Sequence, residues 1–164
     1  MATNEYLISI FSGNEAVVEY QIYHKLAILG STVFSLALIP VWSTVTKAIS
    51  ENKYSWVASL YKRFLFLGSI GVVFQILMIP FYQPIINVWL GSATINVNYF
   101  YAFSFALLGS VIIYNSIFFY ITNGIGKLKL QTFMYILGAL IKIPLAWLLV
   151  EYIGSWIGVV LANL

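Results

Sequence analysis

Charged and reactive side chains are scarce in this sequence. Its 164 residues include no Cys, no Asp and one His, and only 8% of them are charged. A soluble globular domain is about a quarter charged, and a chain that is 62% hydrophobic has too little polar surface to face water throughout. Without Cys there is no disulfide or thiolate metal site, and one His with five dispersed Glu leaves no catalytic triad, carboxylate pair or metal cluster. We therefore expect a membrane protein that is not an enzyme and holds no metal or other cofactor.

The few charges leave long apolar stretches between them. Residues 64–126 contain no Asp, Glu, Lys or Arg, and one helical span needs about 20 apolar residues. The apolar runs are continuous rather than alternating, which indicates membrane helices and not the strands of a barrel. Four full spans are predicted, at residues 20–46, 64–86, 99–122 and 130–150.

Two shorter apolar segments flank these spans. Residues 1–13 and 152–164 are each too short, at about 1.5 Å per helical residue, to cross a hydrocarbon core of about 30 Å. The first has no basic region before its apolar part, so it does not have the pattern of a secretory signal. We expect an all-α, polytopic transmembrane helix bundle with four full spans and a partial helix at each end. This pattern is typical of a fragment of a longer membrane protein.

Basic residues alternate between the two sides of the predicted bundle. Six of the eight Lys and Arg residues lie in loops 47–63 and 123–129, whereas loops 12–19, 87–98 and 151–155 contain none. The positive-inside rule places loops 47–63 and 123–129 in the cytoplasm of a multi-pass protein. Loop 47–63 could also attract anionic lipid headgroups. Because membrane topology accounts for the net charge of +3, nucleic acid is not an expected partner.

Lys142 lies near the middle of the fourth span. A Lys there costs roughly 2.5–3.5 kcal/mol on insertion scales, so it should face protein or a water-filled cavity. Steps of three and four residues place it on a stripe of polar and small side chains. That stripe consists of Gln131, Tyr135, Gly138, Lys142 and Ala146. Lys142 is therefore the leading candidate to bind an anionic substrate, with snorkelling or a carboxylate partner elsewhere as the alternatives.

His24 and Lys25 lie just inside one end of the first span. They could line a cavity and meet a phosphate, or they could be interfacial residues whose polar tips reach the headgroups. Amides also occur within the spans, at Gln75 and Asn115, each on a face with small residues. Packing between helices explains these amides better than sugar binding does.

Proline and aromatic residues mark bends and interfaces. Each Pro within a span removes a backbone donor and predicts a bend; these are Pro40, Pro80, Pro84 and Pro144. Aromatic residues gather near the ends of the spans and predict interface belts. On the side without basic residues they are Trp89, Tyr99, Tyr101, Tyr152 and Trp156, and on the basic side Trp42, Tyr54 and Trp56.

The order of local patterns resembles that of one transporter family. The segments NEYLISIFSG at residues 4–13 and VVEYQIYHKL at 17–26 lead into a helix that closes with IPVWSTVTKA at 39–48. The Pro-x-Trp-Ser-x-x-Thr-x-Ala string in the last segment, followed by Trp56, is the most specific part. These patterns are similar to polysaccharide transporters, the O-antigen and capsule flippases of the multidrug/oligosaccharidyl-lipid/polysaccharide exporter superfamily.

The resemblance implies a function and a larger protein. The chain would be most of the C-terminal lobe of a twelve-helix, two-lobe transporter in the bacterial inner membrane. Such a transporter flips undecaprenyl-pyrophosphate-linked oligosaccharides by alternating access, with the N-terminal lobe and membrane lipids as its partners. The resemblance suggests a cationic cavity for the pyrophosphate, for which Lys142 is the first candidate and Lys25 and His24 are weaker ones.

Two other functions compete with this hypothesis. A drug or cation antiporter of the same superfamily would be expected to carry acidic residues in its cavity, and no Glu lies in the middle of a span. A membrane polysaccharide polymerase would be expected to have a large outer loop with catalytic residues. The longest predicted connection on that side, residues 87–98, is short and uncharged.

Overall fold

The computed structural model describes residues 2–91 and 95–164, and these residues form helices without any strand. Within these described residues, four helical segments are long and apolar enough to cross a membrane. The predicted all-α bundle with four spans is therefore confirmed, and the chain is a multi-pass membrane protein by this criterion. Along the chain the helices are α1 (Ala2–Ser50), α2 (Tyr54–Met78), the short 3-10 helix η1 (Ile79–Phe81), α3 (Tyr82–Leu90), α4 (Tyr99–Ile125), α5 (Leu128–Ile153) and α6 (Ile157–Leu161).

The first helix turns back on itself at Gly13. Gly13 has φ 83° and ψ 173°, outside the helical range and accessible mainly to glycine. The Nδ2 of Asn4 donates to the hydroxyl of Tyr20 at 3.2 Å, and the Nε2 of Gln21 donates to Glu5 Oε1 at 3.4 Å. Sixteen residues of straight helix would separate these partners by about 24 Å. Residues 2–12 therefore fold against the next part of α1, and the predicted loop 12–19 is helical apart from the turn at Gly13.

The helices extend beyond the apolar segments that predict them. α2 begins at Tyr54, whereas the apolar run predicts a second span from residue 64, and α1 continues to Ser50. The predicted loop 47–63 therefore contracts to a turn at residues 51–53. Loop 123–129 contracts to residues 126–127, where Gly126 has φ 83° and its N–H donates to the carbonyl of Thr122. Lys and Arg mark where the apolar core ends, but their long side chains are compatible with continued helix.

Of the four prolines, one lies where an α-helix ends, and the other three lie within α-helices. α2 ends at Met78, and Pro80 lies in the 3-10 helix that joins it to α3. Pro84 lies in the first turn of α3, where a missing N–H is tolerated. Pro40 and Pro144 lie inside α1 and α5, and both helices continue past them. The sequence predicts a bend at each proline, and at Pro80 the α-helix gives way to a 3-10 turn.

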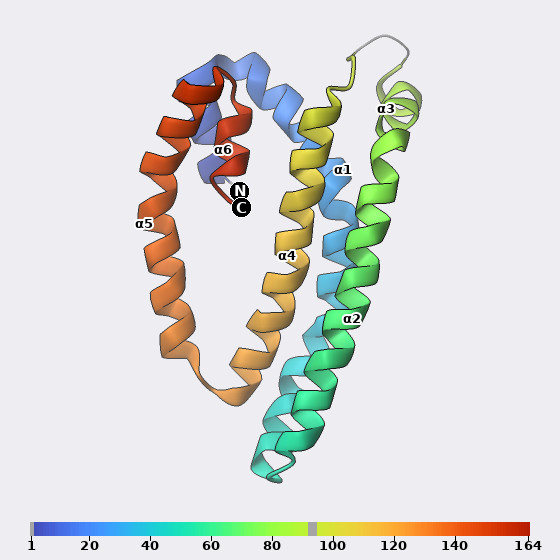
Figure 1. Cartoon of the computed structure of the whole chain (residues 1–164), viewed down its shortest axis with the longest axis vertical. Coiled ribbons are helices and arrows are strands. Elements are labelled where there is room, and N and C mark those ends of the chain that lie inside the picture. The colour runs from blue at the N-terminus through green and yellow to red at the C-terminus, as the bar shows by residue number, and fades with distance from the viewer. Residues whose placement is uncertain (1, 92–94) are drawn as a thin grey trace.

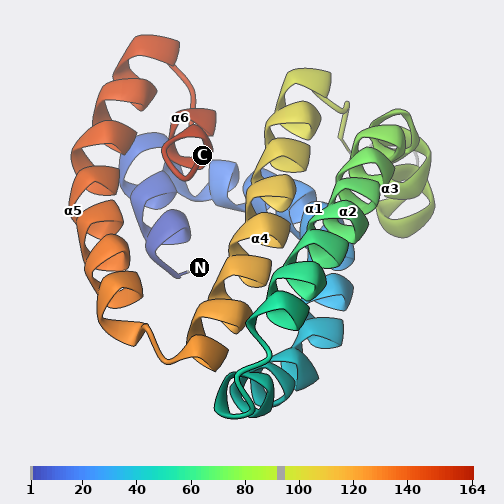
Figure 2. The same cartoon turned by 60° about the horizontal axis from the view of Figure 1, so that its bottom comes forward.

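The central helix of the bundle is α4, which lies between α5 on one side and α2 with the later part of α1 on the other (Figures 1 and 2). Its first half packs in a cluster with the start of α1, Trp156 and α6, and its second half packs with the end of α1 and with α2. The Gln75 side chain of α2 spans both neighbours: its Nε2 donates to the carbonyl of Ala27 at 3.2 Å, and its amide lies against Gly109 of α4. This confirms the predicted packing role of Gln75.

The turns that follow α1 and α4 lie at the same end of the bundle, at the bottom of Figure 1. We call this the basic end, because its turns and flanking residues carry Lys47, Lys53, Lys127 and Lys129. The connections before α4 and after α5 lie at the opposite end (Figure 1). Hairpin connections thus alternate as the charge pattern predicts, while the cytoplasmic location of the basic end stays a prediction.

Candidate functional site

Helix α5 packs less against the rest of the chain than any other span. Only 6% of its most apolar window is buried, against 50% for the corresponding window of α4. The C-terminal end of α5 packs against α6. There Gly158 lies so close that a Cβ added to it would stand 2.5 Å from the backbone N of Val150. Its other end is joined to α4 by the turn at residues 126–127 (Figure 1). Between these attachments, α5 makes few contacts with the bundle.

The polar stripe predicted on α5 faces the bundle. Ala146 is fully buried in the cluster around Trp156, and Gln131 is 5% exposed. Between them, the hydroxyl of Tyr135 donates to Asn115 Oδ1 of α4 at 3.1 Å. Three members of the stripe therefore fix its direction, and Lys142 and Gly138 share their face by helical spacing.

Lys142 is half-buried, while its neighbours Ile141 and Ile143 are more than half exposed. Within residues 2–91 and 95–164 its ammonium group has neither an ion pair nor a hydrogen bond. One turn away, an added Cβ on Gly138 would meet no atom within 4 Å. The inner face of α5 is therefore unfilled beside an unpaired cation.

Gln131 adds a second polar group to this face. Both amide atoms of its side chain are buried, and neither has a hydrogen-bond partner among the described residues. A buried amide group without a partner costs about 1–3 kcal/mol. Gln131, the Tyr135–Asn115 pair and Lys142 give the face both donors and acceptors.

His24 lies in the core of the end opposite the basic end. It is 8% exposed, and its ring stacks on Tyr20 at 5.1 Å between centroids and meets Phe105 edge-on at 6.3 Å. These contacts are those of a packed core residue. The proposed role of His24 in phosphate binding stays a prediction, and this geometry gives it no added support.

Lys25 follows His24 in the chain but points elsewhere. Its side chain is exposed, and its Nζ lies 5.6 Å from the centroid of the Trp89 ring on α3. Because α3 and α5 lie on opposite sides of α4 (Figures 1 and 2), the structure does not bring Lys25 and Lys142 into one site. Of the three predicted residues, Lys142 alone lies on the polar face of α5.

The prediction of an interface belt is wrong for one aromatic residue, Trp156. Its side chain is 5% exposed, and its ring lies 4.8 Å from that of Tyr101. Its Nε1 donates to Glu19 Oε2 at 3.1 Å, and Tyr101 bonds to Ser155 at 2.8 Å. Tyr152 is 90% exposed, as a belt residue would be. The partner of Trp156 lies 137 residues away, so local sequence carries no signal of its burial.

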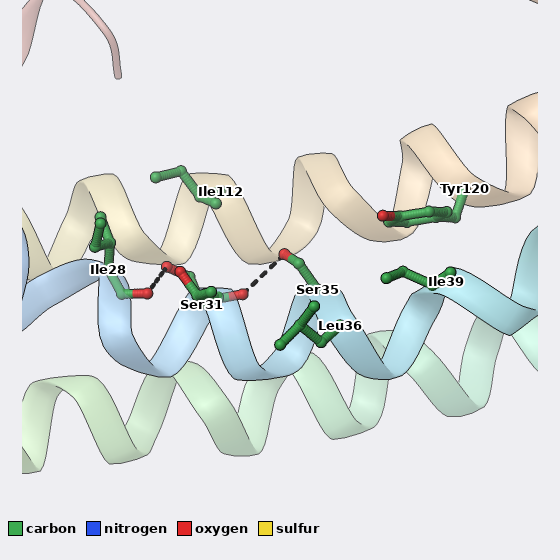
Figure 3. A pocket seen from close by; sticks show the side chains of 8 residues that line it. Ile28, Ser31, Ser35, Leu36, Ile39, Ile112 and Tyr120 are labelled. Carbon is green, nitrogen blue, oxygen red and sulfur yellow. Dashed lines mark hydrogen bonds between the residues drawn. The ribbon is translucent and has the colours of Figure 1, made fainter. Parts of the chain in front are cut away.

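A small recess between α1 and α4, which sequence reasoning missed, has a volume of about 180 Å³ (Figure 3). Its two serine hydroxyls are bonded within α1: Ser31 donates to the carbonyl of Ile28, and Ser35 to that of Ser31. Ser35 also lies 2.9 Å from the hydroxyl of Ser116 on α4. This recess is therefore the site of a polar contact between two helices, and the hydroxyls of Ser31 and Ser35 are already committed.

A scan against protein-family models, a search of curated proteins and a search of solved structures each found no match to this chain. In the part of the chain that the structure describes, no group of three or more His and Glu side chains could hold a metal ion. The polar face of α5, with Lys142 unpaired on it, is the feature that most requires a functional explanation.

Proposed function

We propose that this chain is part of a membrane transporter that flips undecaprenyl-pyrophosphate-linked oligosaccharides across the bacterial inner membrane, for O-antigen, capsule or exopolysaccharide synthesis. The observation that carries the proposal is the inward-facing polar stripe of α5, with an unpaired Lys142 at its centre. The resemblance of residues 4–48 to O-antigen flippases supplies the class of substrate. Lys142 is the residue to which we assign the pyrophosphate.

An unpaired cation inside a span has to be explained by what it binds. A charge in low dielectric is costly alone, and it interacts with an opposite charge far more strongly there than in water. A pyrophosphate brings negative charge and several acceptor oxygens to the ammonium group. The hydrogen bond from Tyr135 to Asn115 keeps this face of α5 turned toward α4.

The loose packing of α5 suits alternating access. An element that changes partners during transport must be able to leave them, and α5 is held mainly at its two ends. In the proposed two-lobe transporter, the N-terminal lobe covers the inner face of α5 and forms the other wall of the pathway. The 164 residues alone would then have one wall, and we expect no transport from them without the other lobe.

A drug or cation antiporter of the same superfamily is the second candidate, and Glu5 is the observation in its favour. Glu5 is half-buried in α1, where a cation could be attracted. Its carboxylate is, however, bonded by Gln21, and that of Glu19 is bonded by Trp156. Glu151 of α5 is exposed near the end of the helix. The unpaired charge on the inner face is positive, which favours an anionic substrate.

The test is complementation of a bacterium that lacks its own oligosaccharide flippase, using the two-lobe protein that the proposal requires. We expect the unchanged protein to restore surface polysaccharide, Lys142→Ala to abolish it at equal membrane abundance, and Lys142→Arg to retain part of it. Lys129→Ala, which removes an exposed Lys from the same helix, is the matched control and should restore fully.

Two outcomes would contradict the proposal in different ways. Full restoration by Lys142→Ala would remove Lys142 from the binding site but keep the flippase. Failure of the unchanged protein with matched and related oligosaccharide pathways would reject the flippase itself. A drug-efflux assay with the same strains would then test the antiporter.

A further inference from the structure

An apolar groove runs along α1 on the side of α2 and α3, away from α5. It consists of two neighbouring hollows of about 410 Å³ and 650 Å³ that share Leu29 and Val33 as lining residues. The first is bounded by Lys25 of α1 and Trp89 of α3, and the second reaches Phe64 of α2. The two hollows therefore follow one another along α1, starting from the Lys25–Trp89 pair.

The length of the groove matches one leaflet of a membrane. Its lining extends on α1 from Lys25 to Ala37, which is about 18 Å of helix at 1.5 Å per residue. Half of the hydrocarbon core of a bilayer is about 15 Å. Along α1, a chain lying in the groove with its polar end at Lys25 would thus have room for about the length of one leaflet.

The walls of the groove suit a flexible hydrocarbon chain. Leu29 and Val33 are 62% and 66% exposed, and Phe74 on the facing helix is 54% exposed. Gly30 and Gly71 lie in the floor of the second hollow, where they have no side chain and the helices approach closely. Most of this surface can be covered only by something apolar.

The mouth of the groove carries a single positive charge. Among the residues that line the two hollows, Lys25 is the only charged one. Its ammonium group lies over the Trp89 ring, and it forms no ion pair with any carboxylate in residues 2–91 and 95–164. An occupant that fits both parts must join an apolar chain to a negatively charged head.

We propose that this groove binds an acyl chain of an anionic phospholipid, with the headgroup phosphate at Lys25. The charge at the mouth and the one-leaflet length favour such a lipid over a protein helix or a second copy of this chain, neither of which requires a cation at that position. The site lies on the other side of α4 from Lys142, so it does not depend on the proposed transport function.

The test is native mass spectrometry of the full chain in detergent, titrated with phosphatidylglycerol or phosphatidylcholine. We expect the first phosphatidylglycerol to bind about fivefold more tightly than phosphatidylcholine, because a Lys near an anionic headgroup contributes a factor of about that size. Lys25→Gln should remove this preference. Val33→Phe, which narrows the groove at its shared wall and leaves the charge unchanged, should weaken the binding of both lipids.

Lys129→Gln is the matched control, because it removes an exposed Lys far from the groove and should leave the first binding event unchanged. The proposal is overturned if Lys25→Gln keeps the preference for phosphatidylglycerol, or if Lys129→Gln reduces that preference equally. It is also overturned if the spectra show a dimer that Val33→Phe abolishes and that excludes lipid, since a second copy would then occupy the groove.

Discussion

A very close contact between α1 and α4 lies near the basic end, and it predicts a large effect from one added methyl group. A Cβ on Gly124 would stand 2.6 Å from both Cβ and Cγ1 of Val45 and 3.0 Å from the carbonyl oxygen of Trp42. Ordinary contacts between carbon atoms are about 3.5–4.0 Å, so the helices would have to separate by about 1 Å. Val45 is fully buried and β-branched, so its side chain has little freedom to move away.

Gly124→Ala should therefore destabilise the bundle. Overpacking of this kind costs about 1–3 kcal/mol, and we expect a value of about 2 kcal/mol. The separation would also stretch the bond from Thr46 Oγ1 to the carbonyl of Gly124, which is already 3.2 Å long. For a chain of this size, such a loss corresponds to a fall in melting temperature of roughly 4–8 °C.

Gly138→Ala is the matched control, because it makes the same chemical change in α5 where an added Cβ meets no atom within 4 Å. It should be neutral or stabilising by up to about 1 kcal/mol, the difference in helix propensity. The assay is unfolding by SDS or heat in detergent micelles, followed by circular dichroism. Equal stability of Gly124→Ala and Gly138→Ala would refute the close approach of α1 and α4 on which this reasoning depends.

Two further predictions concern hydrogen bonding and topology. Trp156→Phe should lower the free energy of unfolding by about 1–2 kcal/mol, because it leaves the Glu19 carboxylate half-buried without its donor; Trp147→Phe, on an exposed side chain of α5, is the control and should have little effect in the same assay. Since the chain has no Cys, single cysteines that replace Lys53 or Tyr152 can be labelled without background. An impermeant maleimide should reach Tyr152→Cys in intact cells and Lys53→Cys only after lysis. The reverse pattern would contradict the predicted orientation.

The number of spans could be predicted from the sequence, because the apolar runs are long and the charges lie between them. The boundaries of the helices could not be predicted in this way. The charge pattern predicts a loop at Lys62 and Arg63, yet α2 begins eight residues before Lys62. A charge reports where hydrocarbon ends, whereas helix ends depend on turns such as the one at Gly126.

The candidate site could be predicted in part. Helical spacing is enough to put Gln131, Tyr135 and Lys142 on one stripe, and the bond from Tyr135 to Asn115 shows that this stripe faces α4. Spacing along one helix says nothing of contacts between helices. The packing of His24 against Phe105 and the bond of Trp156 to Glu19 join residues 81 and 137 positions apart, and no local pattern encodes them.

The return of α1 at Gly13 bears on the order in which the chain can be assembled. Asn4 and Glu5 find partners in Tyr20 and Gln21, which leave the ribosome shortly after them. Glu19 has no such near neighbour, since its donor is Trp156, and Asn4 also meets Asn163 at 3.4 Å. During synthesis the Glu19 carboxylate therefore lies in or near lipid without its hydrogen-bond donor until Trp156 and α6 have been made. Unsatisfied polar groups are costly there. Nascent chains stalled before α6 should be the form most exposed to membrane proteases, and the arrival of Trp156 is the step that ends this exposure.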